Sequence, residues 1–201
     1  MKKLVVGMVI LALMSGAACA DEITEQIDLA KELYQDGLYS DAVEELNYAV
    51  AQIQQLQMEQ LKKAFPEPVD GWNADPVESS GAGMAFFGGG MGLSRDYANT
   101  SSNERVQIQF LANSPLIQSI AMFVQNPALL GSQPGAKLIR MGRIKAVLKF
   151  SEEDQRGELS FVVSGSTLVQ VTGDNIADPE ILVTYAEAIR IDVITEVLGG
   201  S

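Results

Sequence analysis

The sequence predicts an α+β fold in which an N-terminal helical hairpin is followed by an antiparallel β-sheet covered by helices, as an α/β/α sandwich. Two patterns lead to this prediction. Apolar residues alternate with polar ones in three runs between Arg143 and Val171, and short turns separate the runs. This alternation is typical of an antiparallel meander with one buried face. Between Ile23 and Ala64 the apolar spacing is instead that of amphipathic helices.

The three runs define a face of the sheet that needs a cover. Its apolar members are Ile144, Ala146, Leu148 and Phe150 in the first run, Leu159, Phe161 and Val163 in the second, and residues from Thr167 to Val171 in the third. Basic residues lie in or just before the first run, namely Lys137, Arg140, Arg143, Lys145 and Lys149. We expect these cations on the solvent face of the strands, where neighbouring carboxylates balance their charge.

Residues 1–20 have the features of a secretory signal peptide. A short basic start precedes an apolar run, and Ala18 and Ala20 stand in the A-x-A positions before a predicted cut at Asp21. The run is shorter than the roughly 20 residues that a membrane-spanning helix needs. We therefore expect an exported, periplasmic protein. The residues around Cys19 also partly resemble a bacterial lipoprotein cleavage box, so lipidation of Cys19 is the alternative, and we expect membrane attachment only in that case.

Composition excludes several kinds of chemistry. The chain has no histidine, and its single cysteine is Cys19. The mature fold therefore lacks the commonest general base, the commonest metal ligand and a thiol nucleophile. After removal of Lys2 and Lys3, 12 basic residues face 26 acidic ones, a net charge of −14. Such a chain repels polyanions unless a local basic patch overrides the sum, so we expect no nucleic-acid partner.

Residues 21–65 predict a helical hairpin. A first apolar stripe ends at Asp36-Gly37, and a second runs along a long helix that ends near Phe65, because Pro66 cannot continue it. The spaced positions of this segment resemble a tetratricopeptide-type hairpin; they are Ala30, Leu33, Gly37, Tyr39, Ala42, Leu46 and Ala49. No second copy follows, and stacked arrays need three or more repeats, so we predict one hairpin and no solenoid.

Residues 66–71 form a proline-rich linker, which we interpret as the boundary between the modules. Trp72 follows it and either holds the linker on the core or contacts a partner. The glycine-rich stretch that comes next lacks the residues of a phosphate-binding loop and is interpreted as a flexible or bulged edge strand, continued by Leu93, Arg95 and Tyr97. Phe86, Phe87 and Met91 either pack on the sheet or, with Trp72, form a partner-binding patch.

Residues 72–201 predict the α+β sandwich domain. Val106, Ile108 and Phe110 alternate with polar residues as in a half-buried strand. The helix that follows Ser114-Pro115 is apolar almost all round, which predicts burial; the alternative is that it lines a pocket for an apolar ligand. Asp178-Pro179 opens the last helix. Its apolar stripe is expected to cover the meander and comprises Leu182, Tyr185, Ala186, Ile189 and Val193.

The sequence contains no motif to which we assign catalysis. It has no G-x-S-x-G elbow, Asp70, Asp75 and Glu78 do not match a calcium loop, and the acidic turn at Glu152-Glu153-Asp154 is interpreted as solvated. We assign no catalytic residue, no metal site and no cofactor.

The chain resembles a family of uncharacterised exported proteins of Gram-negative bacteria. The resemblance lies in the hairpin pattern, Pro66-Glu67-Pro68, Gly71-Trp72, Phe87-Gly88-Gly89-Gly90, Ser114-Pro115-Leu116, Gly157-Glu158-Leu159 and Tyr185-Ala186-Glu187-Ala188-Ile189. The C-terminal module also resembles the PsbP-like α/β/α sandwich, whose members mostly act by binding proteins. These resemblances imply an exported, non-catalytic envelope protein with an unknown protein partner. A periplasmic carrier of an apolar ligand is the first alternative, and a hydrolase without histidine or cysteine is the second.

Overall fold

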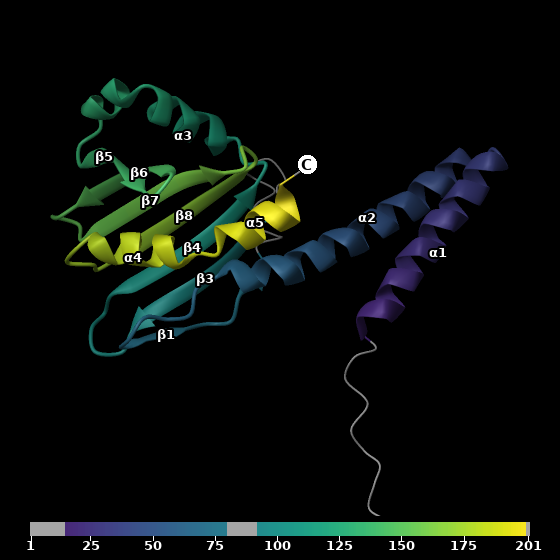
Figure 1. The fold of residues 1–201 in the computed structure, drawn as a ribbon, viewed down its shortest axis with the longest axis horizontal. Helices are drawn as coiled ribbons and strands as arrows, with labels where there is room; N and C mark the ends of the chain where they lie inside the picture. Colours follow the sequence, from purple (N-terminus) through teal and green to yellow (C-terminus); the bar gives the residue numbers. More distant parts are fainter. Residues whose placement is uncertain (1–14, 80–91, 200–201) are drawn as a thin grey trace, which may run out of the picture. The chain divides into compact units, whose positions relative to one another are not determined.

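The structure, a computed structural model, describes residues 15–79 and 92–199 and divides into two compact units, Met1–Leu56 and Gln57–Ser201 (Figure 1). The first unit contains helix α1 (Ser15–Gln35) and most of helix α2 (Tyr39–Leu61). The division falls inside α2, whereas the sequence places the boundary at the linker 66–71. The reason is that the end of α2 and the short helix η1 (Lys62–Ala64) pack into the core of the second unit.

The first unit is the expected helical hairpin. Gly37 stands between the helices with φ +79°, a left-handed conformation that glycine adopts without steric cost. Ala30, Ala42 and Ala49 are buried where the helices meet. Because these side chains are small, the two helices approach closely.

The second unit is built on one antiparallel sheet. The strands in the described residues are β1 (Trp72–Ala74), β2 (Glu78–Ser79), β3 (Gly92–Asn99), β4 (Arg105–Ala112), β5 (Ala136–Met141), β6 (Ile144–Ser151), β7 (Arg156–Val163) and β8 (Thr167–Asp174). Their order is β1-β3-β4-β8-β7-β6-β5, and β2 pairs with β3 beside this path. The predicted meander is therefore confirmed as β6-β7-β8, and the strand at Val106–Phe110 as β4.

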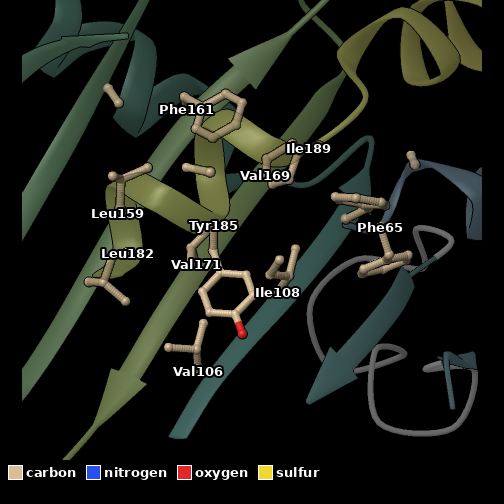
Figure 2. Close-up of a cluster of buried hydrophobic side chains, with 14 of the residues drawn as sticks. Phe65, Val106, Ile108, Leu159, Phe161, Val169, Val171, Leu182, Tyr185 and Ile189 are labelled. Atoms are coloured by element: carbon tan, nitrogen blue, oxygen red, sulfur yellow. The ribbon is translucent and has the colours of Figure 1, made fainter. Parts of the chain in front are cut away.

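One face of the sheet forms the core. Register places Leu148, Leu159, Val171 and Ile108 in one row across four strands, and all four are buried. Helices α4 (Glu180–Ala188) and α5 (Ile191–Leu198) lie on this face. Figure 2 shows the Tyr185 ring among Val106, Ile108 and Val171. The predicted stripe of the last helix thus covers the meander, as expected.

The last helix is broken, although the sequence predicts it as continuous. It ends at Ala188 because Ile189 adopts an extended conformation, and α5 begins at Ile191. The N–H of Arg190 donates to the Ala64 carbonyl at 3.0 Å instead of to a carbonyl of its own helix. The break therefore joins the C-terminal helices to η1.

Helix α3 (Leu116–Gln125) and the 3-10 helix η3 (Pro127–Ser132) lie on the opposite face. Val162 of β7 lines the groove beside α3, and a side chain added at Gly157 of the same strand would meet Leu182 of α4. Side chains an odd number of residues apart in a strand point to opposite faces of the sheet, so α3 and α4 lie on opposite faces. The prediction that α3 is buried is wrong, since none of its residues is. The helix covers only part of a sheet face that is largely polar, so its outer side stays in solvent.

The segment around the linker is held to the sheet. The Phe65 ring stacks on Phe110 with centroids 4.1 Å apart, and the Tyr97 hydroxyl donates to the Pro66 carbonyl at 2.8 Å. Tyr97 belongs to β3, which pairs with β4 on one side and with β1 and β2 on the other. The continuation of the predicted edge strand at Leu93, Arg95 and Tyr97 is therefore an inner strand of the described sheet, whereas the glycine-rich residues 80–91 themselves lie outside the described residues.

Candidate functional site

Of the predicted partner-binding residues, the structure describes Trp72. Trp72 is only 9 % exposed and its ring lies edge-on to Tyr185, with centroids 5.7 Å apart. This position agrees with the interpretation that Trp72 holds the linker on the core. Phe86, Phe87 and Met91 lie outside the described residues. Cys19 lies in the first turns of α1, and its lipidation stays a prediction.

The hairpin exposes a stripe of large apolar side chains, which we call the hairpin face. Its members are 39–66 % exposed and comprise Ile27 and Tyr34 on α1 and Tyr39, Val43, Leu46, Val50 and Ile53 on α2. The α2 members recur every three or four residues, so they share one side of the helix. The Tyr34 and Tyr39 rings contact each other with centroids 5.6 Å apart, which shows that the stripes of the two helices meet on the same side.

The hairpin is also strongly acidic. Glu22 to Leu56 contains eight carboxylates and one lysine, a net charge of −7. On helical spacing, acidic positions such as Glu44 and Glu32 point away from the hairpin face. On the far side, the Gln26 amide donates to the Glu45 carboxylate. An apolar face thus lies on a negatively charged helix pair.

A second candidate surface lies on α3 and the neighbouring strands. Leu116, Met122 and Leu129 of α3 and η3 are 41–49 % exposed, and the sequence from Ala112 to Ala136 has no charged residue. A helix of this apolar composition is normally covered on all sides, so the uncovered outer side of α3 is unusual. The sequence gives no signal that α3 is exposed, because a helix that is apolar on all sides is normally buried in the protein core.

Basic side chains stand beside this helix. Arg140 of β5 is paired in register with Lys145 of β6, and Arg143 lies in the turn between them. We define the α3 surface as these three cations together with Leu116, Met122 and Leu129. Within the described part of the chain no carboxylate forms an ion pair with any of the three. All five cations of the basic run are exposed, as expected. The expected balance by neighbouring carboxylates is found at Lys149, which is paired in register with Glu158 of β7, and, among the described residues, not as an ion pair at Arg140, Arg143 or Lys145.

A groove of about 370 Å³ lies between α3 and the β5–β6 hairpin. Its walls are Ala121, Val124 and Gln125 from α3, Arg143, Ile144 and Lys145 from the β5–β6 hairpin, and Val162 from β7. The lining is therefore apolar at Ala121, Val124, Ile144 and Val162, polar at Gln125 and cationic at Arg143 and Lys145. This geometry suits a molecule with an apolar body and a negatively charged group.

A larger depression, about 500 Å³, lies over the ends of β6, β7 and β8 and contains Asp154, Glu158 and Asp174. Its carboxylates have partners. Asp174 pairs with Arg156 at 2.7 Å, the Ser151 hydroxyl donates to Asp154 at 2.8 Å, and Glu158 accepts hydrogen bonds from Ser160 and Gln170. The described residues hold no group of three or more acidic side chains arranged to bind a metal ion. We therefore interpret this depression as a hydrogen-bonded sheet surface.

The tyrosines in the core are a structural feature of the second unit. Tyr97 and Tyr185 lie with ring centroids 4.5 Å apart, and both side chains are fully buried. Burial raises the pKa of Tyr97 and of Tyr185 above the ordinary value of 10.0. Both hydroxyls therefore stay neutral over the physiological range.

No helix in residues 15–79 and 92–199 is both long and apolar enough to cross a lipid bilayer. Comparison of the chain with protein-family models, with curated proteins and with solved structures gave no match.

Proposed function

We propose that the protein is an exported, non-catalytic binding protein of the cell envelope that works by protein–protein contact. The observation that carries this proposal is the hairpin face. A single repeat-type hairpin leaves one apolar side without a neighbour, and exposed patches of this kind mark interaction sites.

The geometry of the hairpin face favours a helical partner segment. Tyr39, Val43, Leu46, Val50 and Ile53 form a ridge with the three- and four-residue spacing against which another helix packs. The net charge of −7 between Glu22 and Leu56 favours a partner with basic residues beside its apolar stripe. The proposed partner is therefore a basic amphipathic helix of another envelope protein.

A pair of matched variants tests this proposal. Leu46→Gln/Val50→Gln removes exposed apolar side chains from the hairpin face, whereas Leu29→Gln/Tyr48→Gln removes side chains of similar exposure from other sides of the hairpin. Each variant and the parent chain, Asp21–Ser201, are cross-linked in an envelope extract, and the linked proteins are identified by mass spectrometry. We expect one protein to be lost with the first variant and retained with the second.

The cross-linked peptides of that protein should form a basic amphipathic helix, and their yield should fall with added salt. Equal yields from both variants would contradict the proposal, and so would cross-links that form only between copies of this chain. Circular dichroism controls for the helical content of both variants.

The groove beside α3 supports a second candidate function, the carriage of an apolar ligand with a negatively charged group. Its volume of about 370 Å³ falls within the range of small-molecule sites, roughly 300–1,000 Å³. Ala121→Phe should fill the groove, whereas Ala128→Phe places the same ring at an exposed position outside it. Titration with a fluorescent fatty acid should show binding to the parent chain and to Ala128→Phe, and loss of binding in Ala121→Phe.

A further inference from the structure

The charges of this chain are strongly segregated. The full sequence has a net charge of −12, yet the segment from Val106 to Ser151 contains five basic residues and no acidic one. This segment includes α3, η3, β5 and β6. This segment therefore contributes only positive charge to an otherwise acidic chain, although Glu158 of β7 stands opposite Lys149 at its end.

Three of these cations are gathered on one face of the sheet. Arg140 and Lys145 stand directly opposite each other across β5 and β6, and Lys145 lines the α3 groove together with Arg143. Like charges at directly opposed positions destabilise a strand pair. Since no carboxylate in the described part of the chain pairs with them, the repulsion has no internal compensation. A negatively charged surface would supply it.

The apolar half of the α3 surface lies on the same side of the sheet. Met122 is half-exposed on the outer side of α3, and Leu129 is exposed on η3. Figure 1 shows α3 beside the β5–β6 end of the sheet, away from α4 and α5. Apolar and cationic side chains thus face solvent together.

We propose that the α3 surface docks the protein onto a bilayer that contains anionic phospholipids. Leu116, Met122 and Leu129 enter the boundary between head groups and acyl chains, and Arg140, Arg143 and Lys145 contact the phosphates. At such interfaces, burial of apolar area and attraction to anionic lipid act together. A soluble acidic partner would engage the cations and leave the leucine and methionine side chains exposed. This proposal is independent of the hairpin face and does not require a ligand in the groove.

The test is co-sedimentation of the exported form, Asp21–Ser201, with lipid vesicles. We expect binding to mixed phosphatidylglycerol and phosphatidylcholine vesicles, weaker binding when salt is added, and little binding to phosphatidylcholine alone. Arg140→Gln/Arg143→Gln/Lys145→Gln should lower the apparent affinity for the anionic vesicles roughly a hundredfold. The matched control Lys31→Gln/Lys63→Gln/Lys137→Gln removes the same charge from exposed positions outside the α3 surface and should bind like the parent chain.

A second variant isolates the apolar contribution. Met122→Gln/Leu129→Gln keeps every charge and should lower vesicle affinity roughly tenfold, because both side chains lose their transfer into the interface. All the substituted side chains are exposed, so circular dichroism should show unchanged folds.

Three results would each overturn the proposal. They are equal binding to neutral vesicles, equal loss in the charge variant and its control, and full vesicle binding by Met122→Gln/Leu129→Gln. In the last case, heparin that displaced the parent chain and Met122→Gln/Leu129→Gln from anionic vesicles equally well would identify the cations as a site for soluble polyanions.

Discussion

At the scale of single residues, Tyr97 connects the linker to the sheet. Its hydroxyl donates to the Pro66 carbonyl at 2.8 Å, and the same carbonyl accepts a hydrogen bond from Arg95 Nη1 at 3.2 Å. The linker is thus held by two donors from one strand. The proline pattern predicts that the helix ends here, but the donors come from about 30 residues away and have no local signal.

Tyr97→Phe should destabilise the second unit by about 1 kcal/mol. The loss is this small because Arg95 still donates to the Pro66 carbonyl, so the buried acceptor keeps a partner. Urea unfolding followed by fluorescence of Trp72 measures the change. Tyr48→Phe, at an exposed position in the hairpin, should leave stability unchanged; identical values for both variants would show that the hydrogen bond contributes nothing.

The buried tyrosines also predict how stability depends on pH. Burial holds the folded pKa of Tyr97 and Tyr185 above the unfolded value near 10. The stabilising effect is therefore complete below pH 10, and it is lost as pH rises above 10 because only the unfolded chain releases these protons. The free energy of unfolding should fall by up to about 1.4 kcal/mol per pH unit for each tyrosine.

Urea unfolding at several alkaline pH values measures this slope. Tyr97→Phe/Tyr185→Phe should flatten it, since the variant has neither buried phenol. A slope as steep as that of the parent chain would assign the effect to other groups.

At the scale of elements, two glycines allow α4 to approach the sheet. Gly157 and Gly173 are paired in register across β7 and β8. A Cβ at Gly173 would lie 2.6 Å from Ile176 and 2.9 Å from Leu182, and one at Gly157 would lie 2.7 Å from Leu182. The contact between helix and sheet therefore depends on the absence of side chains at these positions.

Gly173→Ala should destabilise the second unit by about 1–3 kcal/mol, because the new methyl group forces Leu182 and Ile176 out of place. Thermal unfolding by circular dichroism measures the change. Gly131→Ala is the matched control, since a Cβ there meets no atom within 4 Å. A Gly173→Ala variant as stable as this control would mean that α4 shifts without cost.

The sequence predicts an element well where only one of its faces is buried, and poorly where both faces contact other parts of the protein. The β6–β8 meander and the α4 stripe follow from clean alternation. Alternation does not distinguish strand β5, because Leu138-Ile139 breaks the pattern in Ala136–Met141. Val147 falls between the buried positions Ala146 and Leu148 in the alternation, on the side that alternation assigns to solvent, but it is 8 % exposed because α3 packs against β6 on that face.

The candidate sites show a similar limit. The basic run is visible in the sequence, but the opposition of Arg140 and Lys145 depends on the register of a strand that alternation does not reveal. The exposure of α3 depends on how little of the polar sheet face it covers. Both are consequences of tertiary packing, which local spacing does not encode.

At the scale of the whole molecule, the boundary between the two units lies between Leu56 and Gln57, inside α2, and not at the linker 66–71. Leu61, Ala64 and Phe65 precede the prolines yet belong to the same core as Phe110, Tyr185 and Ile194. The second unit therefore needs the end of α2 in order to complete its core.

A chain that begins at Gln57 should fold with one cooperative transition, whereas a chain that begins at Glu67 should not. The second lacks Leu61 and Phe65, and loss of two such side chains costs at least about 5 kcal/mol. A domain of this size has a total stability of about 5–15 kcal/mol. Thermal unfolding of both chains measures the difference; equal cooperativity would place the boundary at the linker.

The order of strands also determines which backbone groups another chain could reach. Among the described strands, β5 ends one side of the sheet and the three-residue β1 ends the other. Lys137 and Arg140 project from opposite faces of β5, so a neighbouring molecule that added a strand there would bring cation against cation on both faces. Arg140, which we assign to lipid recognition, thus also protects the protein against growth into fibrils, together with Lys137 on the other face of β5.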